Sequence, residues 1–260
     1  MKKALISSVL FGVLAAGSSM AADLPVKAPI MKAPPPPVYT WTGCYLGGGG
    51  GYGMFDQEHD VEAAGGTVLV PKVDTGGRGW FGTVQGGCDL QFNSFLPILG
   101  GSMIIGAFAD GDWGNIKGTS NIAGFVGDEK LDQSWAAGAR LGWLPTDRFL
   151  TFVSGGYTNA HLRDINYAFP PFAPTLDDPA HRVSGFFIGT GYEYNLGWFP
   201  GLTWKTEYRF ADYGSRTDSI IGIPAGTLAF TSGSHLFVQT LRSELVWRFN
   251  WGGAPIMSRY

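Results

Sequence analysis

The stretch Leu202–Phe210, which reads LTWKTEYRF, decides the fold of this chain. Successive side chains of a β-strand point to opposite faces, so one face of this stretch is apolar and aromatic. The other face carries three charges, on Lys205, Glu207 and Arg209. The same alternation recurs along a chain that begins with an export signal. We therefore predict an all-β fold: an eight-stranded antiparallel up-and-down transmembrane β-barrel with an apolar outside and a charged inside.

The first 40 residues are predicted to lie apart from this barrel. Two lysines, the apolar run Ala4–Ala16 and a small-residue cleavage site ending at Ala21 form a signal peptide over residues 1–21. Residues 22–40 form a disordered, proline-rich periplasmic leader, in which Pro34–Pro37 enforce polyproline II. Residues 41–260 form the barrel. No later stretch has the ~18 to 20 apolar residues of a membrane helix, and no basic cluster indicates a nucleic-acid partner.

Forty glycines and 14% aromatic residues suit a curved sheet better than helices, because glycine is a poor helix former and lets backbones approach closely. Eight strand-like stretches follow, each longer than the ~9 to 11 residues of a tilted membrane strand. They are Thr42–Met54, Gly79–Asn93, Ser102–Trp113, Leu131–Leu144, Phe149–His161, Arg182–Asn195, Leu202–Tyr213 and Ser234–Asn250.

The connections between these stretches alternate in length. Short connections are typical of periplasmic turns and long ones of extracellular loops, so we expect four mobile extracellular loops: Phe55–Arg78, Gly114–Lys130, Leu162–His181 and Gly214–Gly233. Aromatic residues near both ends of the strands predict two girdles at the membrane interfaces, with a packed aromatic core as the alternative. The faces of the fifth stretch, FLTFVSGGYTNAH, are ambiguous.

Several motifs carry a resemblance to a known family. They are the mature start Ala22-Asp23-Leu24-Pro25, Trp41-Thr42-Gly43 before a glycine-rich strand, Lys205-x-Glu207-Tyr208-Arg209, and the ending Trp247-Arg248-Phe249-Asn250-Trp251. The chain resembles the small outer-membrane β-barrel proteins of alphaproteobacteria, which include surface antigens, porin-like proteins and hemin-binding proteins. The resemblance covers nearly the whole mature chain and implies export to the outer membrane of a Gram-negative bacterium. Phe108 departs from it, since such proteins often carry an inward acid there.

The inward charges are the best functional candidates. The interior of an eight-stranded barrel is just wide enough for side chains to fill, and unpaired charges there would be very costly. We predict a lumen ion-pair network made by Arg140, Glu193, Lys205, Glu207, Arg209, Arg242, Glu244 and Arg248, with Asp89, Asp110, Asp112 and Asp132 as further inward acids. A lumen plugged by these pairs is the favoured interpretation, and a narrow water-filled path for small solutes is the alternative.

Two cysteines flank the first long connection. If that hairpin is symmetric about Gly66, Cys44 lies directly opposite Cys88. The periplasm is oxidising, so a cross-strand disulfide is one outcome. Two unbonded thiols are the favoured outcome, because directly opposed strand positions strain the bridge geometry.

The sequence predicts no catalytic residue, no cofactor site and no dedicated metal site. The four histidines, His59, His161, His181 and His235, lie in or beside long loops, where a rim cluster for hemin or a transition metal is the alternative to ordinary surface residues. Ser234 and His235 are adjacent in a strand and therefore point to opposite faces, which places them poorly as nucleophile and base. A soluble lipocalin-like barrel would need apolar residues inside and polar ones outside.

We therefore expect a structural outer-membrane barrel, not an enzyme, that maintains the envelope and presents surface loops. A small-solute porin and a hemin- or metal-binding surface protein are the alternatives. The expected partners are outer-membrane lipid, lipopolysaccharide, the barrel-assembly machinery and, through the leader, peptidoglycan.

Overall fold

The computed structural model describes residues 39–62, 67–94, 100–122, 124–223 and 226–249. The predicted signal peptide and the leader up to residue 38 lie outside these ranges. The strands are β1 (Gly43–Glu62), β2 (Val68–Asn93), β3 (Ser102–Ile122), β4 (Phe125–Thr146), β5 (Phe149–Leu162), β6 (Ile165–Ala168), β7 (Pro174–Asp178), β8 (His181–Asn195), β9 (Leu202–Gly222) and β10 (Thr227–Phe249). Across the described ranges, no helix has the length and apolarity needed to cross a membrane.

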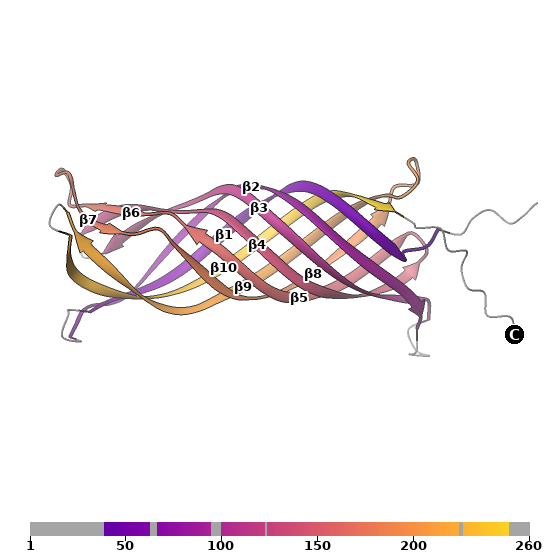
Figure 1. Ribbon diagram of the computed structural model, residues 1–260, viewed down its shortest axis with the longest axis horizontal. Helices are drawn as coiled ribbons and strands as arrows, with labels where there is room; N and C mark the ends of the chain where they lie inside the picture. The colour runs from indigo at the N-terminus through magenta and orange to yellow at the C-terminus, as the bar shows by residue number, and fades with distance from the viewer. Residues whose placement is uncertain (1–38, 63–66, 95–99, 123, 224–225, 250–260) are drawn as a thin grey trace, which may run out of the picture. The chain divides into compact units, whose positions relative to one another are not determined.

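Eight of these strands close a ring (Figure 1). The order is β10-β1-β2-β3-β4-β5-β8-β9, and β9 pairs in turn with β10. Each strand runs antiparallel to its neighbours, so the predicted eight-stranded up-and-down barrel is confirmed. Because Cys44 pairs with Phe249, the first and last strands begin and end at the same edge of the ring. This edge is the periplasmic one, since the short turns also lie there.

The two faces of each strand are sorted as the alternation predicts. Outward side chains are apolar, and large ones such as Leu46, Val84 and Ile188 are exposed. Toward the extracellular side, ring contacts join outward aromatic side chains of adjacent strands in three groups: Tyr52–Trp80, Trp135–Tyr157–Phe186 and Phe210–Phe237. The structure also resolves the ambiguous fifth strand: Val153 is 55% exposed and Phe152 only 3%, so its odd-numbered residues face outward.

Most strands continue well past the membrane on the extracellular side. β1 has 20 residues and β2 has 26, about twice what a tilted crossing needs. The prediction of four long loops is therefore wrong. The prediction fails for a physical reason. Beyond the lipid the outward face of a strand contacts water and carries polar residues, so its sequence pattern resembles that of a loop. Inside, five side chains still pack together: Val61, Ile165, Tyr167, Leu176 and Ile220.

The β6–β7 hairpin completes the extracellular part of the wall. Val126 of β4 pairs with Ala168 of β6, and Leu176 of β7 pairs with Gly222 of β9. The hairpin therefore takes the position between β4 and β9 that β5 and β8 hold within the membrane. The predicted loop Leu162–His181 is in fact largely this hairpin.

The glycine run of β1 is explained by close approach to both neighbours. A Cβ atom on Gly49 would lie 2.1 Å from the Ser243 carbonyl oxygen, and one on Gly51 would lie 2.4 Å from the Phe81 ring. Backbone contact of this kind tolerates glycine only. Although Gly48-x-Gly50-x-x-Gly53 matches a dinucleotide fingerprint formally, it lies within a strand and no helix follows it.

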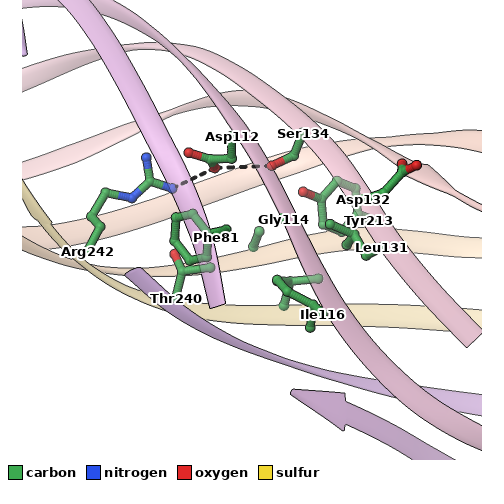
Figure 2. A pocket seen from close by; sticks show the side chains of 12 residues that line it. Phe81, Asp112, Gly114, Ile116, Leu131, Asp132, Ser134, Tyr213, Thr240 and Arg242 are labelled. Carbon is green, nitrogen blue, oxygen red and sulfur yellow. Dashed lines mark hydrogen bonds and ion pairs between the residues drawn. The ribbon is translucent and has the colours of Figure 1, made fainter. Parts of the chain in front are cut away.

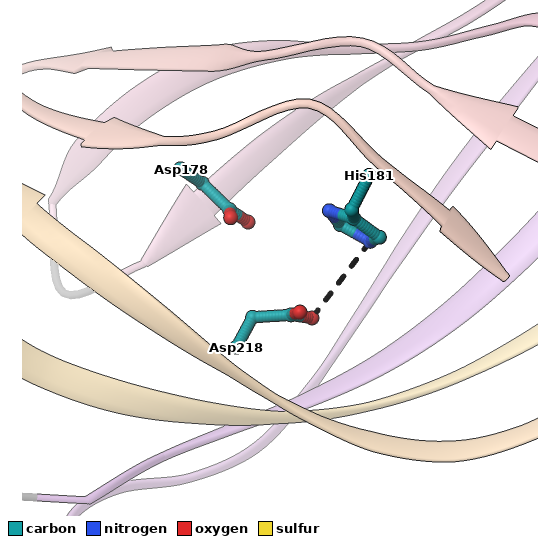
Figure 3. Close-up of side chains that lie close together, drawn as sticks. All are labelled: Asp178, His181 and Asp218. Atoms are coloured by element: carbon teal, nitrogen blue, oxygen red, sulfur yellow. Dashed lines mark ion pairs between the residues drawn. The ribbon is translucent and has the colours of Figure 1, made fainter.

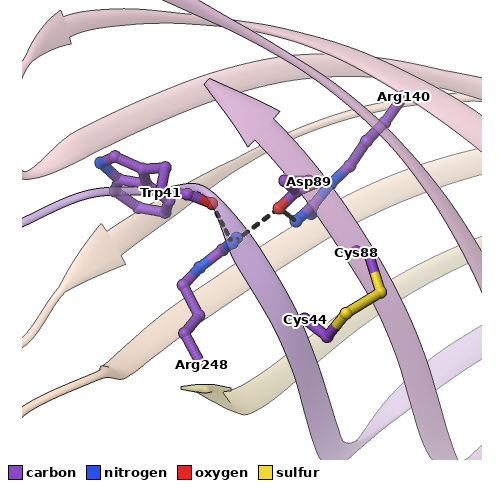
Figure 4. Close-up of a disulfide and its surroundings, with 6 residues drawn as sticks. All are labelled: Trp41, Cys44, Cys88, Asp89, Arg140 and Arg248. Carbon is purple, nitrogen blue, oxygen red and sulfur yellow. Dashed lines mark hydrogen bonds and ion pairs between the residues drawn. A yellow bond between two sulfur atoms is a disulfide. The ribbon is translucent and has the colours of Figure 1, made fainter. Parts of the chain in front are cut away.

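The structure joins Cys44 and Cys88 by a disulfide (Figure 4). The register places the two residues directly opposite each other, as the symmetric hairpin predicts, with their Cα atoms 3.9 Å apart. The preference for two unbonded thiols is therefore wrong. Closely spaced positions of an antiparallel ladder bring opposed side chains into contact.

Removing this bridge should lower stability without changing the fold. It closes a separation of 44 residues, so replacing both cysteines by serine should cost about 2–4 kcal/mol of unfolding free energy. Urea unfolding in detergent micelles measures the loss, with Ala107→Ser, an outward position opposite Cys88, as the control. Free thiols in oxidised, folded protein would contradict the bridge.

Candidate functional site: charges across the barrel lumen

The inward face of β9 begins the lumen network. Lys205, Glu207 and Arg209 occupy alternate positions and are 2%, 0% and 4% exposed. They point inward because Trp204, Thr206 and Tyr208 between them face lipid. Charges in this position need partners from other strands, since water is scarce and the surrounding wall has low polarity.

Nearest the periplasm, two arginines share two acids. Arg140 of β4 donates to both oxygens of Asp89, at 2.9 Å and 2.5 Å, and to Glu193 at 3.3 Å. Arg248 of β10 donates to Asp89 at 2.6 Å and to both oxygens of Glu193 at 2.9 Å. This cluster ties β2, β4, β8 and β10 together across the lumen. Figure 4 shows Asp89 between the two arginines.

In the middle of the lumen, Lys205 is the shared cation. Its ammonium lies 2.8 Å from Glu207 and 3.7 Å from Glu244. It also donates to the side-chain oxygen of Gln85 at 2.8 Å, while the amide nitrogen of Gln85 donates to Glu244. The Gln85 side chain therefore bridges Lys205 and Glu244 in the middle of the lumen.

Toward the extracellular side, Asp110 accepts from two arginines. Arg209 binds its two oxygens at 3.1 Å and 2.9 Å, and Arg242 binds one of them at 3.1 Å. Arg242 also donates to Asp112 at 3.0 Å, which accepts from Ser134 at 3.1 Å. Arg209 also lies 3.4 Å from Glu207, so the groups from Lys205 to Ser134 form one network. The periplasmic cluster of Arg140 and Arg248 with Asp89 and Glu193 is a second group of ion pairs. The Phe152 ring lies 5.4 Å from both the Arg140 guanidinium and the Lys205 ammonium.

A small cavity lies at the extracellular end of this network (Figure 2). Its volume is about 30 Å³, and its polar lining includes Asp112, Ser134 and Arg242. One oxygen of Asp112, the Thr240 hydroxyl and the Arg242 Nε have no protein hydrogen-bond partner. A polar cavity of this size suits one or two water molecules.

Aromatic rings fill the space beside the cations. The guanidinium of Arg140 lies 4.5 Å from the Tyr45 ring centre, and that of Arg209 lies 4.1 Å from Phe187. Phe108, the departure from the family pattern, lies 5.6 Å from the Lys205 ammonium. Cations over ring faces gain electrostatic attraction and lose access to water.

Trp41 lies at the periplasmic end of the lumen. Its side chain is 1% exposed, its indole donates to the Asp147 carbonyl at 3.0 Å, and its own carbonyl accepts from Arg248 at 3.2 Å. Four buried apolar residues pack with it: Ile104, Leu144, Leu150 and Phe152. Each wide residue removes space through which water would pass.

The structure brings all eight predicted network residues together, and Asp89, Asp110 and Asp112 join them. Asp132 does not: it binds His161 at 2.7 Å and Arg163 at 2.8 Å near the rim, because a bulge between Leu131 and Gln133 interrupts the alternation. The sequence reasoning missed Gln85 and Tyr45. Their signal was available, since both occupy inward positions of predicted strands.

The four histidines do not form one rim cluster. His161 pairs with Asp132, and His235 lies on the outer side, stacked on Phe237. His59 is 5% exposed, and burial lowers its pKa. His181 lies 3.9 Å from Asp218. Of the four, only His59 and His181 therefore face the inside of the barrel on its extracellular side, a region we call the extracellular chamber.

Ser234 and His235 do not contact each other as a nucleophile and base would. The Ser234 hydroxyl donates to Asp218 at 3.1 Å, and His235 contacts Asp212 and Ser215. The carboxylate of Asp212 binds Nε2 and the Ser215 hydroxyl binds Nδ1, the reverse of a Ser-His-Asp triad.

A closed antiparallel barrel with an apolar belt, outward aromatic rows and a charged lumen defines a class: the protein is an outer-membrane β-barrel protein of a Gram-negative bacterium. The chain is 27% identical over 233 residues to the 31 kDa outer-membrane immunogenic protein of Brucella melitensis, covering 83% of this chain and 89% of the relative. It is 30% identical over 127 residues to Porin Omp2a of Brucella abortus, covering 45% of this chain and 36% of the porin. The resemblance to alphaproteobacterial outer-membrane proteins is thereby confirmed.

No family model matches the chain. Among solved structures, the outer membrane protein OprG from Pseudomonas aeruginosa is 13% identical, with a TM-score of 0.49 over 80% of this chain and 97% of that one. The outer membrane protein AlkL is 12% identical, with a TM-score of 0.44 over 85% of this chain and 99% of that one.

Removing Arg248 should destabilise the barrel strongly. Arg248→Ala leaves Glu193 and Asp89 buried with one fewer cation, so we expect a loss of about 3–5 kcal/mol. The matched control is Arg163→Ala, which removes an arginine that is 56% exposed and pairs with Asp132 at the rim. That change should cost at most about 1 kcal/mol. Urea unfolding in micelles compares them, and equal losses would contradict a buried, coupled network.

Proposed function

We propose that this protein is a structural barrel with a closed lumen, which contributes to envelope integrity and presents its extracellular part at the cell surface. The observation that carries this proposal is the ion-pair network of the lumen, which forms two groups: one around Arg248 and Glu193, and one from Lys205 to Ser134. Its charged side chains reach one another directly across the barrel, so they occupy the path that a solute would take.

Two further features support a closed lumen. Trp41 and its apolar neighbours fill the periplasmic end below the network. Above the network, the cavity beside Asp112 measures about 30 Å³, room for water but not for a nutrient. Buried pairs of this kind are expensive to separate, since each freed charge would lose its partner in a space of low polarity.

Surface presentation is supported by the extracellular continuation of the strands. The related Brucella melitensis protein is named for its immunogenicity. A paired strand extension offers antibodies and other surface ligands a defined shape. We propose outer-membrane lipid and lipopolysaccharide as the partners of the belt and rim, the barrel-assembly machinery during insertion, and peptidoglycan as the partner of the leader. The proposed role includes no catalysis.

A small-solute porin is the second candidate. The observation that favours it is the 30% identity to Porin Omp2a over 127 residues. Because that match spans 36% of the porin, it carries less weight than the filled lumen of this chain.

Single-channel recording in planar bilayers separates the two candidates. We expect no steady conductance steps from the folded wild-type protein at neutral pH, because paired side chains fill the lumen. Lys205→Ala combined with Glu207→Ala removes one positive and one negative group from the middle of the network and should permit ion flow. Thr206→Ala, on the lipid side of the same strand, is the matched control and should stay closed. Steady wild-type steps would overturn the closed-lumen proposal.

A further inference from the structure

The extracellular wall has a break between β8 and β9. Their ladder ends at Phe186 and Asp212, and pairing with β9 resumes on β7 at Asp177 and Ile221. Pro179 and Ala180 connect β7 to β8, so the β6–β7 hairpin does not continue in line with β8. Within the described residues, β9 between 213 and 220 is therefore paired on one side only, to β10.

Three potential metal ligands converge at this break (Figure 3). Asp178 is the last residue of β7 and His181 is the first residue of β8. Asp218 lies in the part of β9 that pairs with β10 only. One ligand atom of each lies within 4.8 Å of the others. Tetrahedral ligands of one ion at ~2.0–2.2 Å lie roughly 3.3–3.6 Å apart. The three side chains would therefore close in by up to about one ångström to hold an ion.

The hydrogen bond of His181 prepares it to bind a cation. Its Nδ1 lies 3.1 Å from the Pro179 carbonyl oxygen, which only accepts, so Nδ1 carries the proton. In the neutral ring, Nε2 then presents a lone pair toward Asp218 at 3.9 Å, too far for a hydrogen bond. A backbone carbonyl that fixes the tautomer in this way is the usual outer partner of a metal-bound histidine.

Two buried side chains without partners point to a missing ligand. Glu129 of β4 is 1% exposed, and the Thr75 hydroxyl is the neighbouring donor, but neither carboxylate oxygen makes a hydrogen bond of good geometry. Both ring nitrogens of the buried His59 also lack a partner. Both residues face the inside of the barrel on its extracellular side, Glu129 from β4 and His59 from β1. Buried polar groups are otherwise almost always paired, so these two require an explanation.

The charge balance of the chamber also favours a cation. Glu129, Asp178 and Asp218 are 1%, 7% and 5% exposed, and Arg216 pairs only with Asp218. Buried charges in proteins are either paired or coordinate metals, so carboxylates that outnumber the cations here favour a bound cation.

We propose that Asp178, His181 and Asp218 bind a divalent transition-metal ion, of the Zn²⁺ or Mn²⁺ class, at the break between β8 and β9, with Glu129 and His59 as nearby donors. An imidazole among carboxylates favours these ions over Ca²⁺ and Mg²⁺, which prefer oxygen ligands alone. The ion joins β7, β8 and β9 where backbone pairing is missing. This site lies outside the membrane and is independent of whether the lumen conducts.

The test is metal binding by the full chain folded in detergent micelles and freed of metal with a chelator. Isothermal titration with Zn²⁺ should show one site per chain, and Mn²⁺ binding should appear by electron paramagnetic resonance. Asp178→Asn and His181→Ala should each weaken Zn²⁺ binding by at least about tenfold. Ca²⁺ and Mg²⁺ should bind much more weakly.

The controls are His161→Ala and His235→Ala, which remove the two histidines outside the chamber and should leave Zn²⁺ affinity unchanged. The near-isosteric Asp178→Asn keeps the test valid if His181→Ala does not fold, and a heat-modifiable gel shift reports folding. The proposal is overturned if the wild-type protein binds no stoichiometric Zn²⁺ or Mn²⁺. It is also overturned if folded Asp178→Asn binds as tightly as the two control variants, or if Ca²⁺ binds more tightly than Zn²⁺.

Discussion

The need to pair every charge inside a closed, narrow barrel governs this structure. Lipid outside forces charged side chains inward, and the interior of eight strands is too small to hydrate them all. Arginines therefore serve two acids each, as Arg248 does for Asp89 and Glu193. Breaking one contact leaves the partner charge buried and unpaired in an interior of low polarity. The energies of the contacts are therefore coupled. Wall and lumen thereby stabilise each other.

Beyond the membrane the wall continues into water with β6 and β7 in place of β5 and β8, and the chemistry of its interior changes. The charged network gives way to a small apolar cluster around Tyr167 and Ile220. At the break in the wall lies a group of acids and histidines, including Asp178, His181 and Asp218, that is not neutralised by arginine to the same extent. The two regions are therefore distinct: one is balanced within itself, and the other has the excess negative charge that a cation would offset.

The alternation in the sequence predicted the strands, their faces and the inward set of charges. It did not predict where the strands end, because a polar segment such as Phe55–Arg78 is compatible both with a solvent-exposed strand and with a loop. Nor did it predict partners: Lys205 contacts Gln85, which lies 120 positions away in the sequence, because barrel closure brings β2 opposite β9. Nor did it predict that Asp132, which lines the cavity, pairs with His161 and Arg163 instead of a lumen arginine, because the one-residue bulge beside it leaves no clear mark in the sequence.

By itself, the sequence determined the class of fold, its location and the chemistry of each face, since a period of two together with an export signal leaves few other solutions. Only the tertiary structure decided which charges meet, that Cys44 bonds to Cys88, and that Asp178, His181 and Asp218 converge. The reason is the same in each case. Periodicity sets the direction of a side chain along one strand, whereas contact depends on register, tilt and closure among strands distant in sequence.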